Sequence, residues 1–94
     1  MDNKMELVFK TRDNLYAINK TSDPLWQEVF GQDVVEYTVL KYDYGLSKII
    51  GMSGWYILWR GESLKNCFDY LVKKNIIKKS EAIASLGILT TQEK

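Results

Sequence analysis

The spacing of hydrophobic and polar residues changes about two thirds of the way along this chain. Residues 5–11, 15–19, 34–42 and 55–60 carry apolar side chains largely in alternation with polar ones, which is typical of strands with one buried face. After residue 63, apolar residues recur every three or four positions, the spacing of an amphipathic helix. The pattern therefore predicts strands first and helices afterwards.

The helical pattern is clearest after Ser63, whose hydroxyl suits the N-cap position. Asn75 tolerates the left-handed backbone that ends a helix. We expect a second helix after Ser80, and a short one that is capped by residues 22–23 and begins at Pro24, because proline is favoured at the first helical position. The apolar stripe of the helix after Ser63 consists of Leu64, Cys67, Phe68, Leu71 and Val72.

Turn-forming residues divide the middle of the chain. Asp43, Tyr44 and Gly45 precede residues 46–52, and Ser53 and Gly54 follow them, so we expect residues 46–52 to pair back as a hairpin strand. The predicted fold class is α+β, an antiparallel sheet of about four to five strands with a short helix after the first hairpin and two C-terminal helices packed on one face. Residues 1–94 form a single domain, with residues 90–94 as a frayed tail.

Alternation also predicts which side chains share a face of the sheet. Trp55, Ile57 and Trp59 form the more apolar side of their strand, so we expect them to point toward the helices. Val35, Tyr37 and Val39 would point the same way. The opposite face would carry Tyr56, Leu58 and Arg60 beside Glu36, Thr38, Leu40 and Tyr42.

The composition argues against most catalytic chemistry. The chain has no histidine and one cysteine, so the usual zinc sites and cysteine–histidine pairs are excluded. Cys67 lies on the predicted apolar stripe, where a thiol is buried and unreactive. The glycines lack the spacing of a phosphate-binding loop. We expect a protein that is not an enzyme and that uses no metal and no cofactor.

The chain also lacks signals for membrane insertion or export. No apolar run is long enough to span a bilayer, and the charged residues 1–6 lead into no apolar segment of the kind found in signal peptides. The single cysteine cannot form an internal disulfide. These features predict a cytoplasmic protein that makes no contact with a membrane.

Tyrosine and arginine beside exposed apolar groups are typical of protein interfaces. The predicted outer face of the sheet and its aromatic turn provide this combination, although Glu36 and Arg60 could also be a weak pair on an ordinary sheet surface. We expect a small non-catalytic protein-binding domain, with an inhibitor or modulator of a host protein, of the type that phages and mobile elements encode, as its most concrete role. The candidate protein-binding residues are Tyr42, Tyr44, Tyr56, Arg60, Glu36 and Lys48.

Charge is unevenly distributed and offers an alternative function. Residues 1–47 carry five basic and eight acidic side chains, whereas residues 48–94 carry eight basic and four acidic ones. A nucleic-acid-binding module would use the basic cluster, although lysines at a helix end also stabilise the helix and stay in water. A structural subunit that self-associates through a sheet edge, as a homo-oligomer, is a third alternative. The candidate phosphate-contacting residues are Lys73, Lys74, Lys78 and Lys79.

Overall fold

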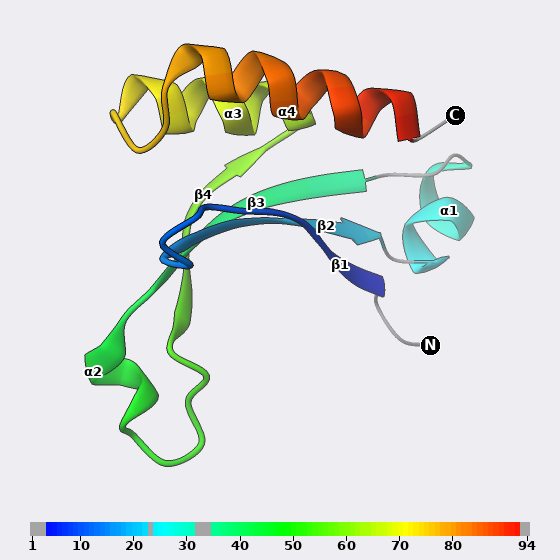
Figure 1. Cartoon of the computed structure of the whole chain (residues 1–94). Coiled ribbons are helices and arrows are strands. Elements are labelled where there is room, and N and C mark those ends of the chain that lie inside the picture. The colour runs from blue at the N-terminus through cyan, green and yellow to red at the C-terminus, as the bar shows by residue number, and fades with distance from the viewer. Residues whose placement is uncertain (1–3, 23, 32–34, 93–94) are drawn as a thin grey trace.

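A computed structural model describes residues 4–22, 24–31 and 35–92 of the chain (Figure 1). Its four strands form one antiparallel sheet in which every strand pairs with its neighbour in sequence. The strands are β1 (Lys4–Lys10), β2 (Tyr16–Ser22), β3 (Val35–Tyr42) and β4 (Trp55–Gly61). β1 and β4 are therefore the two edges, and the predicted α+β class with an antiparallel sheet is confirmed.

The helices are α1 (Pro24–Phe30), α2 (Tyr44–Ser47), α3 (Leu64–Lys73) and α4 (Lys79–Gln92). Figure 1 shows α3 and α4 side by side over one face of the sheet, while α1 lies beyond the ends of the strands. None of the described helices forms a layer over the other face. The predicted short helix after the first hairpin and the pair of C-terminal helices on one face are both confirmed.

Both predicted ends of α3 are present. The Ser63 side-chain oxygen accepts a hydrogen bond from the Asn66 backbone N–H at 3.1 Å, as an N-cap does. Asn75 adopts a left-handed backbone with φ of 59° just after the helix. The helix places Leu64, Cys67, Phe68 and Leu71 in the core.

Helix α4 differs from its predicted bounds. It begins at Lys79, so Ser80 lies inside the first turn instead of capping it, and it continues through residues 90–92, which the sequence pattern assigns to a tail. Ala82, Leu86 and Leu89 pack against the core and hold the helix in place. Residues 93 and 94, like Asp23 at the predicted start of α1, lie outside the described residues. Within the described ranges, no helix combines the length and the apolar composition needed to cross a bilayer.

Residues 46–52 do not form the expected strand. The Asp43 carboxylate accepts hydrogen bonds from the backbone N–H groups of Gly45 at 2.7 Å and Leu46 at 3.2 Å, which starts α2 instead. The exposed loop that follows is closed where the Asp43 N–H donates to the Gly54 carbonyl at 2.7 Å. This β3–β4 connection extends away from the sheet and helices (Figure 1). The described sheet therefore has four strands, without a fifth from this segment.

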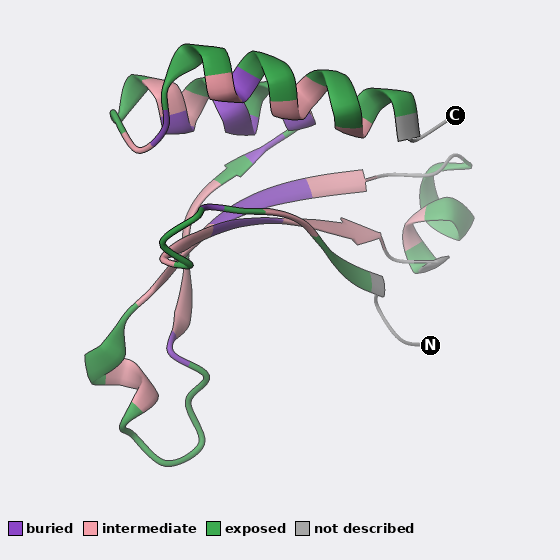
Figure 2. Cartoon of the chain, in the orientation of Figure 1, coloured by how far each residue is buried: buried purple, intermediate pink, exposed green. Residues whose placement is uncertain are grey.

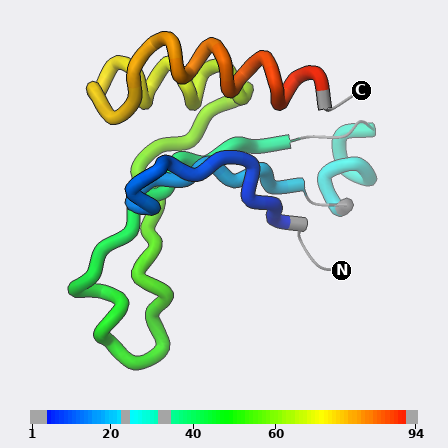
Figure 3. Tube along the Cα trace, in the orientation of Figure 1, coloured from blue at the N-terminus to red at the C-terminus, as the bar shows by residue number. Residues whose placement is uncertain are grey.

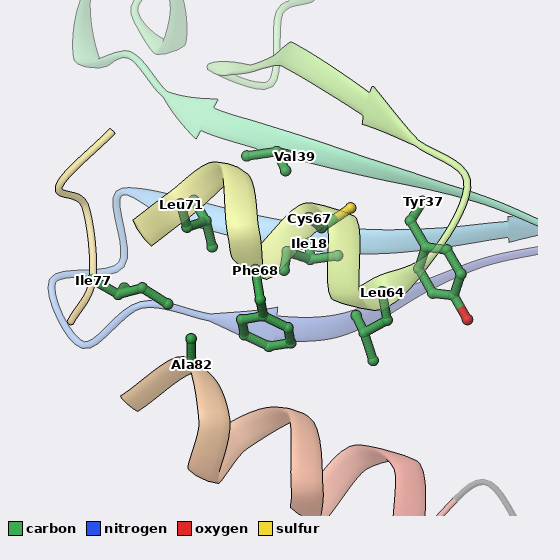
Figure 4. Packing of buried hydrophobic residues seen from close by; sticks show 9 residues of the cluster. All are labelled: Ile18, Tyr37, Val39, Leu64, Cys67, Phe68, Leu71, Ile77 and Ala82. Carbon is green, nitrogen blue, oxygen red and sulfur yellow. The ribbon is translucent and has the colours of Figure 1, made fainter. Parts of the chain in front are cut away.

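The core lies between the sheet and its two covering helices. Figure 2 shows that buried residues are concentrated in β2, β3 and α3, the elements between which the core lies. The largest fully buried side chains are Phe68, Ile18, Leu71, Val39 and Cys67. Figure 4 shows that they come from β2, β3 and α3, with Ala82 of α4 beside Phe68. The Phe68 ring also meets Phe9 of β1 edge-on, with 4.9 Å between ring centres.

Two β-bulges change the predicted faces of the edge strands. The register shifts between Leu7 and Phe9 in β1, and opposite Val39 and Leu40 in β4, where Leu58 is the extra residue. Two consecutive residues then pack on the helical side of each edge strand: Val8 with Phe9, and Leu58 with Trp59. Beyond the bulge in β4 the alternation is inverted.

The expected inward positions of Trp55 and Ile57 are therefore wrong. Trp55 pairs with Tyr42, and Ile57 pairs with Leu40, on the side of the sheet that has no helices. The predicted outward positions of Leu58 and Tyr56 are wrong for the same reason. Only Trp59 keeps its expected inward position, where its ring stacks on Tyr70 of α3 with 5.1 Å between ring centres.

Candidate functional site

The uncovered side of the sheet is called the open face here. Directly paired residues of an antiparallel sheet point to the same side, so the strand register assigns its members. They are Met5, Leu7, Lys10, Ala17, Asn19, Thr21, Glu36, Thr38, Leu40, Tyr42, Trp55, Ile57 and Arg60.

The open face is hollowed in two adjoining places. One hollow of about 370 Å³ lies toward Trp55 and Lys10, and another of about 260 Å³ lies toward Glu36 and Arg60. Met5, Asn19 and Leu40 line both hollows and therefore lie at the boundary between them. Trp26 of α1 lines the second hollow and bounds the open face at that end.

Large apolar side chains on the two edge strands of the open face are in contact with solvent. Met5 is 67% exposed, Leu7 59% and Ile57 48%, whereas Val39 on the helical side of the same sheet is fully buried. Scattered single apolar residues are normal on a protein surface, but neighbouring ones that line shared hollows form a patch. The open face is such a patch on a regular, hydrogen-bonded sheet.

An aromatic cluster occupies one end of the open face. The Tyr42 ring meets Trp55 edge-on at 5.2 Å and Tyr44 at 5.0 Å between ring centres. Lys10 places its ammonium nitrogen 5.7 Å from the centre of the Trp55 ring, within the range of a cation–π contact. These contacts fix the orientation of the rings, so the cluster presents a preformed surface.

An ion pair occupies the other end. Arg60 Nη1 lies 3.0 Å from Glu36 Oε1, across β3 and β4. The Arg60 side chain is 62% exposed, so solvent screens the pair and its contribution to stability is at most about 1 kcal/mol. A larger consequence of the ion pair is that Arg60 neutralises the charge of Glu36. The two residues thus form the weak cross-strand pair that the sequence indicates as an alternative to a binding role.

The structure brings together part of the predicted protein-binding set. Glu36, Tyr42 and Arg60 share the open face, and Tyr44 joins Tyr42 from α2. Tyr56 lies on the other side of the sheet, opposite Lys41. Lys48 is exposed at the C-terminus of α2, in the β3–β4 connection and not on the open face.

Sequence reasoning placed Leu40 on the open face, as the structure has it, but missed the other apolar members, because alternation assigned them to the core or did not use them. Trp55 and Ile57 are displaced by the bulge in β4, and Trp26 arrives from a separate helix. The one sequence signal was Leu58, an apolar residue on the side predicted to be polar.

The predicted basic cluster is divided between two hollows. Lys73 and Lys79 line one between α3 and α4, together with Lys65 and Asp69. Lys79 also lines a second hollow with Lys78, on the side of the β1–β2 turn. Lys74 instead lies with its ammonium nitrogen 5.9 Å from the centre of the Tyr70 ring.

The described residues provide little reactive chemistry. Burial raises the pKa of the Cys67 thiol to about 11, so the thiol is protonated at neutral pH and a poor nucleophile. Among the described side chains, no three histidine, cysteine or carboxylate groups gather in a way that could hold a metal ion.

Comparison of the chain with protein-family models, curated proteins and solved structures gives no match. The functional proposals therefore rest on the geometry and charge of the surfaces described above.

Proposed function

We propose that this protein is a small non-catalytic domain that binds another protein through the open face. One observation carries the proposal: the helices cover a single face of the sheet, and the other face exposes a hollowed apolar patch between an aromatic cluster and an ion pair. Large apolar patches with polar rims mark interaction sites on soluble proteins. Tyrosine, tryptophan and arginine, all present here, are enriched among the residues that dominate binding energy.

The charges of the open face indicate the chemistry of its partner. Glu36 is paired with Arg60, whereas Lys10 makes no ion pair with any residue that the structure describes. An uncompensated positive charge therefore remains beside the Trp55 end of the patch. The partner we propose has an apolar surface for Leu7, Leu40 and Ile57, and a carboxylate that reaches Lys10.

A binding domain without catalytic groups acts through the protein that it holds. We propose an inhibitor or modulator of a cytoplasmic host protein, of the type encoded by phages and mobile elements. Two features support this finer role: the chain is small, and it has few catalytic side chains. Both features are common among such accessory proteins.

The test uses a matched pair of substitutions. Ile57→Lys places a charge on the open face, at a residue that is already 48% exposed on the edge strand β4, where lysine is well tolerated. Ile83→Lys makes the same change at a residue of α4 that is 63% exposed. Partners captured from the native host by the wild type are identified by mass spectrometry, produced separately and titrated by calorimetry.

We expect a one-to-one complex with a different protein that Ile57→Lys weakens by about 2 kcal/mol or more, near 30-fold in Kd, while Ile83→Lys has little effect. Circular dichroism checks that both variants remain folded. Equal loss in the two variants, or loss with Ile83→Lys alone, would place the interface elsewhere. If instead the molecular mass in solution rose with protein concentration, and Ile57→Lys abolished that rise, the partner of the open face would be a second copy of this chain.

A further inference from the structure

A second surface lies at the end of the molecule where the β1–β2 turn meets the α3–α4 connection. These two segments, residues 11–15 and 74–78, are far apart in sequence but lie at the same end of the fold (Figures 1 and 3). Between them is an open hollow of about 1120 Å³, called the basic groove here. Its charged lining consists of Lys10, Arg12, Lys78, Lys79 and Glu81.

The basic groove has a strong excess of positive charge. Lys10 and Arg12 come from the strand side, and Lys78 and Lys79 from the helical side, so cations face the hollow from two separate segments. All four are exposed, and none makes an ion pair within the part of the chain that the structure describes. Glu81 is the one carboxylate among the described residues that line the groove.

The nearby Asp13 is engaged within its own turn. Its carboxylate oxygen Oδ1 accepts hydrogen bonds from the Thr11 hydroxyl at 2.5 Å and from the Leu15 backbone N–H at 3.0 Å. These bonds lower the pKa of Asp13, so it is charged, but it does not line the basic groove. The turn thus presents Arg12 to the groove while its acidic neighbour stabilises the backbone.

We infer that the basic groove binds the phosphate backbone of a nucleic acid, at a site that shares Lys10 with the open face but none of its other described members. Its lining is mainly polar, with cations on both sides, and it is wide and open to solvent. Such a groove suits a chain that carries a negative charge on every unit and is held without regard to sequence. The near-neutral charge of the whole chain does not oppose this, because Glu28 of α1, Asp43 at the N-cap of α2 and Glu36 of the open face do not line the groove.

The test measures binding of fluorescein-labelled oligothymidylate of about 20 nucleotides, and of a duplex of similar length, by fluorescence anisotropy. If all four cations contact phosphates, affinity for the single strand falls about 50-fold between about 50 and 200 mM salt, and affinity for the duplex about 150-fold. Tighter binding of the oligothymidylate would indicate a single-stranded ligand, and tighter binding of the duplex a double-stranded one. Either one supports a phosphate-binding groove.

Matched variants locate the site. Arg12→Glu and Lys78→Glu reverse charges on the two sides of the groove, and Lys48→Glu makes the same change in net charge in the β3–β4 connection. We expect each groove variant to weaken binding about tenfold or more, and the control to change it less than about twofold. Arg12→Gln and Lys78→Gln, which perturb folding less, should each reduce the salt slope by about 0.7 for the single strand.

Three results would overturn the inference: no binding to either oligonucleotide at low salt, an affinity that does not change with salt, or equal weakening by Lys48→Glu. Displacement of the oligonucleotide by polyglutamate at equal charge concentration would favour an acidic protein as the ligand and would also contradict it. Binding to the open-face partner should be unaffected by Arg12→Glu, so the two proposals can fail separately.

Discussion

Both faces of the sheet carry large apolar side chains, yet helices cover only one of them. On the covered face, Ile18 and Val39 are completely buried and Trp59 stacks on Tyr70 of α3. On the open face, Met5 and Leu7 are more than half exposed although they belong to the same regular sheet. Apolar composition therefore does not define the core here; what defines it is which face α3 and α4 cover.

The β-bulges of the edge strands explain how the two faces came to share the apolar residues. Each bulge adds a second consecutive apolar side chain to the covered face and inverts the alternation beyond it. In β4 this sends Trp55 and Ile57 to the open face. The edge strands thereby supply both the core and the surface that we propose to be functional.

The largest expected effect is on the covered face. Phe68→Ala removes a side chain that is 1% exposed and that meets Phe9 edge-on, so we expect the free energy of unfolding to fall by about 3–5 kcal/mol. Urea denaturation followed by tryptophan fluorescence measures it. A loss below about 1 kcal/mol would mean that the space beside Phe68 collapses freely, and the two faces would then be alike in packing.

The second prediction uses the buried thiol of the same face. Burial raises the pKa of Cys67 from 9.0 to about 11, so the unfolded chain releases this proton at a lower pH than the folded protein. Stability due to Cys67 is complete below about pH 9 and is lost between about pH 9 and 11, by roughly 1 kcal/mol per pH unit. Thermal unfolding of the wild type and of Cys67→Ala across this range isolates the effect. If the stability of the wild type and of Cys67→Ala changed with pH in parallel, the thiol would have the same pKa in the folded and unfolded chains, against this prediction.

The third prediction concerns the aromatic end of the open face. A Cβ atom at Gly54 would lie 2.8 Å from the Tyr42 ring and 2.9 Å from Ser47 Cβ, at a φ of 88°. Gly51 has the same φ but open space around it, so Gly51→Ala measures the backbone cost alone, about 1–2 kcal/mol. We expect Gly54→Ala to lose about 1 kcal/mol more in urea denaturation. Equal losses would mean that Tyr42 shifts easily and that the cluster is not preformed.

The smallest effect is expected on the edge strand β4 of the open face. Ile57→Ala shortens a side chain that is already 48% exposed, so we expect the free energy of unfolding to change by less than about 1 kcal/mol. The same urea denaturation measures it beside Phe68→Ala. A loss close to that of Phe68→Ala would show that the open face contributes to stability as a core does, which would weaken its proposed role in binding.

Local features were predicted well from the sequence because neighbouring residues determine them. The apolar stripe of α3, its cap at Ser63 and its left-handed end at Asn75 all depend on residues within a few positions. The inward positions of Tyr37 and Val39 likewise follow from alternation in β3, which has no bulge of its own. The candidate set built on this alternation includes Glu36, Tyr42 and Arg60, which share the open face.

Features that depend on distant contacts were not predicted. A bulge forms when an edge strand fits its partner and the helices above it, so alternation alone misplaced Tyr56, Ile57 and Trp55. Asp43 could cap a helix or begin a turn, and the structure has the helix.

The sequence by itself determined the α+β class, the helices after residue 63 and the strand segments, since residue periodicity and local capping specify them. Only the tertiary structure decided which side of the sheet is left uncovered, and that Arg12 and Lys78 border one groove. The physical reason is that periodicity acts over a few residues, whereas faces and grooves form when segments far apart in the chain pack together.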